Sequence, residues 1–362
     1  MITRRIFLNY STIAAISYSL TINSCSKVSN PPNNTLSNIA KMNQRLYGSA
    51  INSSYMNDVT YLQLIKDNCN IITPEWEMKW AELEPTPGEF NTYNLDKIID
   101  FAVTNNLKVR GHTLFWDTSH PKHRSFPPSV QEFSDMYEQV MRRYEQKNVI
   151  FCWDVINEVL IDPQMNPSDT TDNPDWSLLK GVTPELLRDI VQVVNRRSPN
   201  LETYINDFNI EQAGDKQDKF LKLGQYLAQN TNLTGLGIQS HLIFSKENPF
   251  QIDEFEDLLK KIKDIGLKPV ITELDVIMYP PFPNSIEEID HIIGDLYQKY
   301  CETAINNGVD TIVTWGITDK FSYIYDFTQQ QREQTRPHPF DSHMNPKKAR
   351  DAIAEALSMP IK

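Results

Sequence analysis

The alternation of short β-type runs with longer helical patterns limits the fold of this sequence more than any other feature. Eight runs rich in apolar, β-branched or aromatic residues follow one another, at 46–51, 70–75, 108–116, 150–158, 202–208, 236–242, 268–276 and 311–318. The segments between them space apolar residues three or four apart, as amphipathic helices do. One such segment, 252–266, ends at Gly266, a usual helix stop. Eight strand–helix units over residues 40–358 predict an α/β protein, a single-domain (β/α)8 TIM barrel.

A doubly wound parallel sheet is the alternative, because it shows the same alternation. Dinucleotide-binding sheets of that kind carry a Gly-x-Gly-x-x-Gly turn after a strand. This sequence contains no such turn. The barrel is therefore favoured.

Composition limits the partners of the chain. Its formal net charge is −12 and 40% of its 362 residues are hydrophobic. Nucleic acid phosphates would be repelled by this charge, so we expect no nucleic-acid partner. A neutral or cationic substrate fits better, and the apolar content is sufficient for a large core.

The first 28 residues predict an export signal. Arg4 and Arg5 precede a modest apolar stretch, which resembles a twin-arginine leader and is too short to span a bilayer. An uncleaved N-terminal arm is the alternative. Cys25 is a candidate lipoprotein anchor, which would give a periplasmic, extracellular or membrane-anchored protein. A polar, Pro/Asn-rich linker is expected at 29–39.

The other cysteines, Cys69, Cys152 and Cys301, lack the spacing of metal ligands. In an oxidising compartment, a disulfide between Cys69 and either Cys301 or Cys152 is an alternative to free thiols.

Polar or aromatic residues come late in nearly every β-type run. They are Glu75, His112, Trp116, Asn157, Glu158, Asn206, Asp207, Gln239, His241, Glu273, Asp275, Trp315 and Asp319. The C-terminal ends of barrel strands form the face that carries active sites. The sequence therefore predicts one site at this rim.

Two carboxyl groups of this set, Glu158 and Glu273, are expected to face each other across that rim. Such a pair can cleave a glycosidic bond, provided that one is protonated and the other is ionised. Glu158 has the more apolar neighbours, which would raise its pKa. Gln239 and His241 are expected on one strand face, and Glu273 and Asp275 on the next, so that His241 can donate to both carboxylates. A strand-end salt bridge is the alternative for either glutamate alone.

A metal site is the competing use of His112 and His241. Metal-dependent barrel hydrolases usually carry His-x-His after the first strand, and here no run bears two histidines. We therefore expect no metal and no cofactor. The histidines of the Pro-rich loops, His120, His123, His338 and His343, are expected to be solvated.

At these residues the sequence resembles glycoside hydrolase family 10, the retaining endo-β-1,4-xylanases. Seven motifs carry the resemblance in order: "EWEMKW", "GHTLFW", "WDVINE", "YINDFN", "GIQSHL", "ITELDV" and "TWGITD". The resemblance makes Glu158 the proton donor, Glu273 the nucleophile and Asn157 the partner of a sugar 2-hydroxyl. It implies an enzyme that acts on xylan or a related β-glycan, and we expect a monomer. The supporting residues that it implies are Glu75, Lys79, His112, Trp116, Gln239, His241, Asp275, Trp315 and Tyr323.

Several positions depart from the family pattern. Trp76 stands where Asn is usual, Asp117-Thr118-Ser119 replaces His-Ser-Gln, and Tyr323 and Phe208 replace Trp and Tyr. The same chemistry on another β-glycan or glycoconjugate is therefore the alternative, followed by a non-catalytic sugar-binding barrel.

Overall fold

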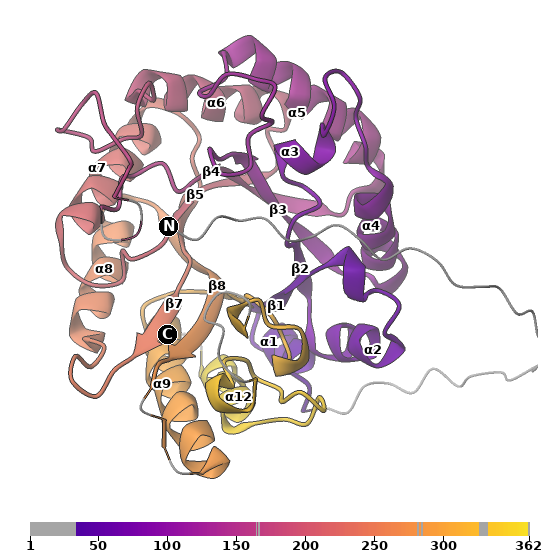
Figure 1. Cartoon of the computed structure of the whole chain (residues 1–362), viewed down its shortest axis with the longest axis vertical. Helices are drawn as coiled ribbons and strands as arrows, with labels where there is room; N and C mark the ends of the chain where they lie inside the picture. The colour runs from indigo at the N-terminus through magenta and orange to yellow at the C-terminus, as the bar shows by residue number, and fades with distance from the viewer. Residues whose placement is uncertain are drawn as a thin grey trace, which may run out of the picture. The chain divides into compact units, whose positions relative to one another are not determined.

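All strands of the computed structural model, which describes residues 34–360 apart from 164, 166, 281, 284 and 326–331, run parallel to their neighbours in one closed sheet (Figure 1). Around the ring, the pairing follows the order β6–β5–β4–β3–β2–β1–β9–β8, and β8 pairs again with β6. The strands are β1 (Leu46–Ile51), β2 (Ile71–Pro74), β3 (Lys108–Phe115), β4 (Ile150–Asn157), β5 (Glu202–Asp207), β6 (Gly235–Ile238), β7 (His241–Phe244), β8 (Lys268–Met278) and β9 (Thr311–Thr314).

The sixth predicted run forms two short strands. Ser240 has a φ of 66° and interrupts the extended chain between β6 and β7. Both pieces pair with β8, at Ile238↔Ile271 and at His241↔Asp275, so they occupy one position in the ring. The predicted (β/α)8 barrel is confirmed with eight strand positions, while the expectation of one regular strand over 236–242 is wrong.

Helices cover the outside of the ring (Figure 1). Two of the longer ones begin with clear capping residues: Ser129 and Glu132 form a capping box at α5, and Thr183 precedes Pro184 at the start of α6. The helices are α1 (Leu36–Met42), α2 (Val59–Asn68), α3 (Trp80–Leu83), α4 (Tyr93–Asn105), α5 (Val130–Tyr144), α6 (Pro184–Arg197), α7 (Asp215–Asn230), α8 (Ile252–Asp264), α9 (Ile286–Asn306), α11 (Arg332–Thr335) and α12 (Lys348–Ser358).

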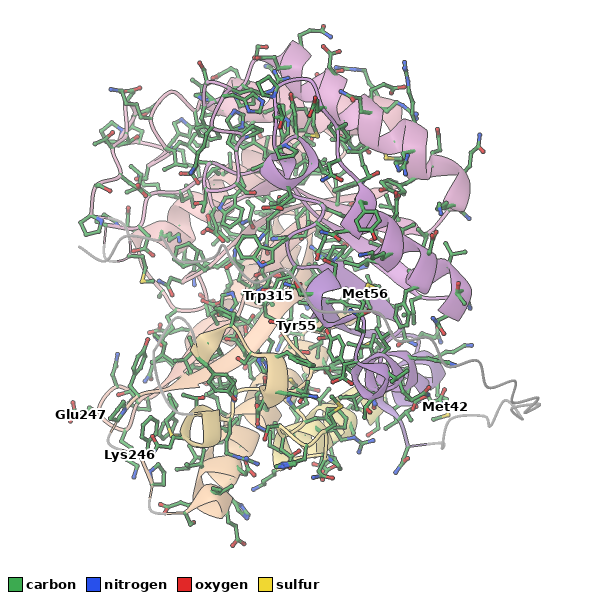
Figure 2. All side chains as sticks on the ribbon, turned by 45° about the vertical axis from the view of Figure 1, so that its right-hand side comes forward. Met42, Tyr55, Met56, Lys246, Glu247 and Trp315 are labelled. Atoms are coloured by element: carbon green, nitrogen blue, oxygen red, sulfur yellow. The ribbon has the colours of Figure 1, made fainter. Side chains whose placement is uncertain are left out.

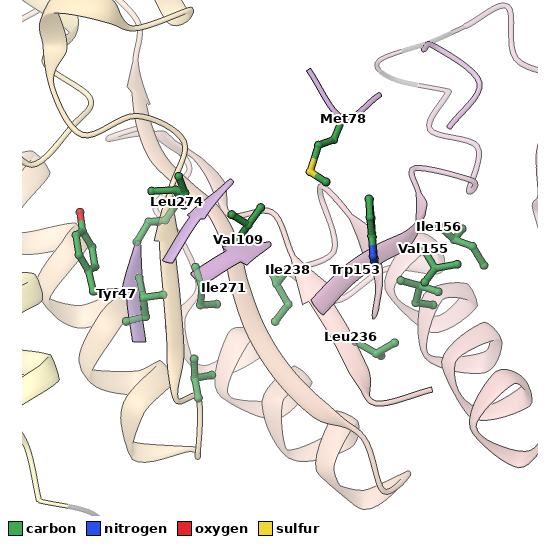
Figure 3. Packing of buried hydrophobic residues seen from close by; sticks show 14 of the residues in the cluster. Tyr47, Met78, Val109, Trp153, Val155, Ile156, Leu236, Ile238, Ile271 and Leu274 are labelled. Carbon is green, nitrogen blue, oxygen red and sulfur yellow. The ribbon is translucent and has the colours of Figure 1, made fainter. Parts of the chain in front are cut away.

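Both faces of the sheet are buried, and the large apolar cluster of the core lies on one of them. Trp153 and Val155 of β4, Val109 of β3 and Ile271 of β8 are all inaccessible to solvent, and Figure 3 shows these side chains in the same cluster. Burial on both faces is what a parallel sheet covered by helices requires.

Other expectations meet the structure at the ends of the chain. Residues 1–33, with the expected export signal and Cys25, lie outside the described residues. The linker expected at 29–39 ends earlier, because α1 begins at Leu36 and this side chain is fully buried. Among the described residues, no helix is long and apolar enough to cross a membrane.

The structure also decides between the alternatives for the cysteines and corrects the expectation for one histidine. Cys69, Cys152 and Cys301 are buried free thiols, so neither disulfide forms. His338 is fully buried, so the expectation of a solvated residue is wrong there. A Cβ at Gly316, whose φ is 134°, would come within 2.8 Å of the His338 ring, so the chain needs glycine where it passes this imidazole.

Candidate active site

The C-terminal rim of the barrel gathers the predicted polar residues from seven strand positions. Glu75 follows β2, Trp116 follows β3, Glu158 follows β4, Gln239 follows β6 and Trp315 follows β9. Glu273 lies inside β8, because that strand continues to Met278. Figure 2 shows Trp315 near the middle of the molecule, with Lys246 and Glu247 at its periphery.

Glu158 is held at the mouth by its backbone and by three donors. Its φ is 51°, and its N–H donates to the Asn206 carbonyl oxygen at 3.0 Å. Its Oε2 accepts from Trp116 Nε1 at 3.0 Å. Its Oε1 accepts from Gln239 Nε2 at 2.8 Å and from Asn157 Nδ2 at 3.0 Å. A left-handed backbone at a glutamate costs of order 1–3 kcal/mol, and such outliers concentrate at functional sites.

The pKa of Glu158 is raised. Burial is the largest cause, and the negative charge of Glu273 adds to it, while the hydrogen bond from Gln239 acts in the opposite direction. The predicted direction is confirmed, although the immediate neighbours of the carboxyl group are donors as well as apolar groups. Glu158 is therefore suited to hold a proton.

Glu273 has the opposite environment. It is 4% exposed, and its Oε1 accepts from Asn206 Nδ2 at 2.7 Å. Its Oε2 lies 3.4 Å from His241 Nε2, and its Oε1 lies 4.0 Å from His112 Nδ1. Burial alone would raise the pKa of Glu273, but the charges of His112 and His241 and the bond from His241 outweigh it and lower the pKa. Glu273 is therefore suited to remain an anion.

His241 lies between two carboxylates, as the sequence predicts. Its Nδ1 is 3.0 Å from Asp275 Oδ1, and its Nε2 faces Glu273. Burial alone would lower the pKa of His241, but the charge of Asp275 outweighs burial and raises it well above its usual range. The Tyr323 hydroxyl lies 3.2 Å from the same Nδ1. The protonated imidazole can thus donate to both neighbours.

Asn206 connects the two carboxyl groups; the sequence places it among the polar residues of the rim, but the family resemblance assigned it no role. Its Nδ2 group donates to Glu273 Oε1 and, at 2.9 Å, to Asn157 Oδ1, while Asn157 in turn donates to Glu158. Its own Oδ1 accepts from the Thr272 hydroxyl at 2.7 Å, which fixes the orientation of the amide. Its position late in a strand was the available sign.

The buried side chain of Lys79 lies beside two indole rings, those of Trp76 after β2 and Trp116 after β3. Lys79 is 3% exposed, and its Nζ lies 3.9 Å from the centre of the Trp76 ring and 4.5 Å from that of Trp116. Trp76 is 44% exposed and donates through Nε1 to Glu75 Oε1 at 3.2 Å. Burial lowers the pKa of Lys79, against the attraction of Glu273, Glu75 and Glu158.

A charged pair inside the barrel supports His112. Arg110 and Asp154 are each 1% exposed and form two bonds, at 2.9 and 2.5 Å. Asp154 Oδ2 also lies 3.1 Å from His112 Nδ1. The Trp315 and His112 rings pack edge to face with their centres 5.1 Å apart. Asp154 therefore has a structural role inside the barrel, because it neutralises Arg110 and orients His112.

The structure thus brings the twelve predicted site residues into one connected network. Two other polar residues predicted at the strand ends form ion pairs outside this network. Asp319 pairs with Lys347 at 2.7 Å, and Asp207 pairs with Lys216 at 2.8 Å. No group of three or more His, Cys, Asp or Glu side chains suited to a metal ion occurs in the described part of the chain.

A cavity of about 780 Å³ adjoins the network on the side of β4, β5 and β7. It begins at Leu160, two residues after Glu158, and it reaches His241. We call it the leaving-side cavity. Its lining residues are Leu160, Ile161, Asp162, Pro163, Met165, Ser177, Asn209, Glu211, Gln212, Ala213, Gly214, Asp215, Lys216, Gln217, Lys219, His241, Leu242, Ile243, Ser245, Asn248 and Phe250.

Comparison with known proteins gives one consistent family. The family described as glycosyl hydrolase family 10 matches residues 35–356. The β-1,4-xylanase of Dictyoglomus thermophilum is 30% identical over 314 residues, which cover 83% of this chain and 85% of that protein. Endo-1,4-beta-xylanase A of Thermoanaerobacterium saccharolyticum is 27% identical over 326 residues, and the match covers 26% of its length.

Solved structures agree in fold. Xylanase 10B of Thermotoga maritima superposes with a TM-score of 0.76 at 26% identity, covering 89% of this chain and 98% of that one. Xylanase 10B of Thermotoga petrophila, solved with xylobiose, gives the same TM-score at 25% identity and covers 89% and 97% of the two chains.

Proposed function

The chain belongs to glycosyl hydrolase family 10, and on this premise we propose that it is an endo-1,4-β-xylanase that cleaves internal β-1,4 bonds of xylan with retention of configuration. The relatives and solved structures that resemble it are named as xylanases, which supports xylan as the substrate. A glycoside hydrolase of this kind requires no cofactor.

The observation that carries the proposal is a pair of carboxyl groups with opposed pKa shifts, joined through Asn157 and Asn206. In the proposed first step, Glu273 attacks the anomeric carbon while Glu158 protonates the departing glycosidic oxygen. A covalent glycosyl–enzyme ester results. In the second step, Glu158 removes a proton from water, which attacks the same carbon and releases Glu273. Two inversions give net retention.

The remaining network has supporting roles in this proposal. Asn157 hydrogen-bonds the 2-hydroxyl next to the reacting carbon. Lys79 and Glu75 bind hydroxyl groups, and Trp315 packs against the sugar above His112. Each of these side chains is already held by a neighbour, which favours preorganised binding.

Azide rescue tests the two assignments separately. Glu158→Ala should lower turnover of xylan by about 10²–10⁴-fold, and Glu273→Ala by at least as much. The substrate for the rescue is an aryl β-xylobioside with an activated phenolate leaving group, which departs without a proton from Glu158. Azide should restore turnover of this substrate by Glu273→Ala and give the α-glycosyl azide, since it attacks the face that Glu273 has left. It should restore turnover by Glu158→Ala and give the β-glycosyl azide, since it attacks the ester in place of water.

The matched control for these variants is Glu202→Ala. Glu202 is also a strand glutamate, but it begins β5 at the opposite end of the barrel. This variant should keep its activity. Full activity in either active-site variant, or the opposite anomers with azide, would contradict the assignment.

A related retaining enzyme for another β-glycan is the second candidate, and the exposed Trp76 indole favours it. Asp117 and Ser119, in the loop after β3, also depart from the family pattern. Rates on xylan, cellulose and aryl β-xylosides distinguish the two candidates. Preference for a glucan would replace xylan as the substrate and leave the chemistry unchanged.

Export is a separate part of the proposal. It is supported by Arg4, Arg5 and the apolar stretch that follows, with Cys25 as the site of a lipid anchor. Mass spectrometry of the mature N-terminus in a bacterial host tests cleavage and acylation, and light scattering tests the expected monomer. An intact N-terminus in the cytoplasmic fraction would contradict export.

A further inference from the structure

The Tyr323 hydroxyl contacts the histidine that holds Glu273 as an anion. Its oxygen lies 3.2 Å from His241 Nδ1, and the two rings meet edge to face with their centres 5.9 Å apart. The other ring nitrogen, Nε2, lies 3.4 Å from Glu273 Oε2. The imidazole therefore separates the Tyr323 hydroxyl from the proposed nucleophile and touches both.

The segment that places Tyr323 is fixed by contacts with other parts of the chain. Tyr323 is partly buried and follows the short helix η3 (Asp319–Phe321). Asp319 pairs with Lys347 at 2.7 Å, and the Phe321 ring stacks on that of Tyr55 with their centres 4.1 Å apart. The hydroxyl is thus held in position before a substrate binds.

Several titratable groups interact with His241 from the elements around it. They lie in β8, in the loops after β5 and η3, and in the segment before α12, and they are Glu273, Asp275, Glu211, Tyr323 and His338. Burial raises the pKa of Glu211 and lowers that of His338, so each favours its uncharged form. Among the described residues, only Asp275 and Tyr323 lie within hydrogen-bonding distance of His241 Nδ1. The charge of the imidazole therefore depends on these two residues and on Glu273.

Tyr323 keeps its proton and can donate it to Asp275. Burial raises the pKa of Tyr323 well above its usual range. When His241 is protonated, its Nδ1 is a donor, so the tyrosine oxygen can only accept from it and the hydroxyl proton is directed to Asp275. Asp275 is inaccessible to solvent, and burial raises its pKa, while the charge of His241 and the hydrogen bonds from His241 and Tyr323 act against burial. The hydroxyl thus favours the ionised carboxylate that holds the proton on His241.

On the premise of the proposed function, we infer that the Tyr323 hydroxyl is a positioning residue of the reaction, which holds Asp275 and His241 as an ion pair and through them keeps Glu273 ionised. Tyr323 replaces the tryptophan that is usual in the family. An indole has no oxygen that could accept from Nδ1. The chain of contacts from Tyr323 to Glu273 is therefore a feature of this sequence and is not implied by the family pattern.

Replacement of the hydroxyl tests this inference, because Tyr323→Phe keeps the ring. Loss of the donor favours neutral Asp275, weakens the hold on the His241 proton and thereby favours the protonated form of Glu273. The acidic limb of kcat/KM against pH reports protonation, in the free enzyme, of the group that must be ionised. On an aryl β-xylobioside, this limb should move to higher pH by about 0.5 unit. The loss of kcat/KM relative to wild type should then be about threefold greater below the limb than at the maximum.

A fluorinated tyrosine at residue 323 gives the opposite perturbation, because fluorine makes the hydroxyl a stronger donor. It should move the limb to lower pH. The matched control is Tyr137→Phe, since Tyr137 is also a buried tyrosine and its hydroxyl donates to the Ser198 hydroxyl at 2.8 Å, away from His241. This control should leave the limb in place. An unmoved limb in folded Tyr323→Phe, or a limb that moves to lower pH, would overturn the inference.

Nitrogen NMR of isotopically labelled histidine tests the same contact without catalysis, with the His241 signal identified by its loss in His241→Gln. Tyr323→Phe should lower the pKa of His241 by about 0.5–1 unit, and Tyr137→Phe should leave it unchanged. An unchanged pKa of His241 in Tyr323→Phe would overturn the inference. Failure of the proposed function gives a different result, namely no turnover by the wild type at any pH while the pKa of His241 still responds to Tyr323→Phe.

Discussion

Replacement of Gln239 by methionine tests how the proton affinity of the acid is set. Gln239 is 2% exposed and donates to Glu158 Oε1 at 2.8 Å. Methionine has a similar length and no donor. A hydrogen bond to a charged group contributes about 1.5–3 kcal/mol and one to a neutral group about 0.5–1.5 kcal/mol. The loss therefore penalises the carboxylate by about 1 kcal/mol more than the neutral acid, which is roughly 0.7 pKa unit.

The direction follows from which form the bond favours. The amide donor favours ionised Glu158, so its loss raises the pKa of Glu158 further above the ordinary value of a glutamate. The basic limb of kcat/KM against pH reports loss of the proton from the general acid in the free enzyme. This limb should therefore move to higher pH by about 0.5–1 unit.

The assay is the initial rate on an aryl β-xylobioside across the pH range, with Gln217→Met as the control. Gln217 is also buried and also loses one bond, to the Ile210 carbonyl oxygen, but it does not contact Glu158. Gln217→Met should leave the limb in place. A limb that moves to lower pH in Gln239→Met, or that stays in place while the variant remains folded, would refute the assignment of Glu158 as the tuned acid.

Further predictions concern stability and the other contacts of the site. Asp154→Asn should lower the free energy of unfolding by about 3–5 kcal/mol in urea titrations, because it leaves the charge of Arg110 buried without a partner; a loss below 1 kcal/mol would contradict this. Asn206→Ala should lower kcat on xylan by about 10²-fold, since two buried hydrogen bonds that align the carboxyl groups are lost; an unchanged kcat with a raised KM would assign Asn206 to binding alone. Trp76→Ala should lower kcat/KM for an aryl β-xylobioside more than for the aryl β-xyloside if the exposed indole contacts a second sugar, and equal losses would exclude that contact. Prolonged treatment with a chelator should leave the rate on xylan unchanged, and a loss that added metal reverses would favour metal chemistry.

The strand positions and most of the site could be predicted from the sequence, because strand period and strand-end polarity are local properties. The run at 46–51 coincides with β1, and that at 108–116 exceeds β3 by one residue. Closure of the ring then brings the strand ends together without further information. Glu158, Glu273 and His241 were found in this way.

What escaped prediction depends on contacts between distant segments. Ser240 adopts its left-handed backbone where its N–H and hydroxyl bond Glu211 and Tyr300, and no local pattern indicates either partner. The hydrogen bond from Asn206 to Glu273 joins β5 to β8, and it forms only when the barrel is closed. Burial of His338 depends on the passage of the chain at Gly316 beside it. The size of the leaving-side cavity is set by loops whose lengths alone do not fix their paths.

The electrostatic coupling of Glu273 to Glu158 has a consequence for the timing of the proposed reaction. The anionic charge of Glu273 helps to keep the proton on Glu158. Esterification of Glu273 removes that charge, so the intermediate itself weakens the hold of Glu158 on a proton. The same side chain is thus converted from acid to base by the progress of the first half-reaction, and no movement of the protein is needed between the two halves.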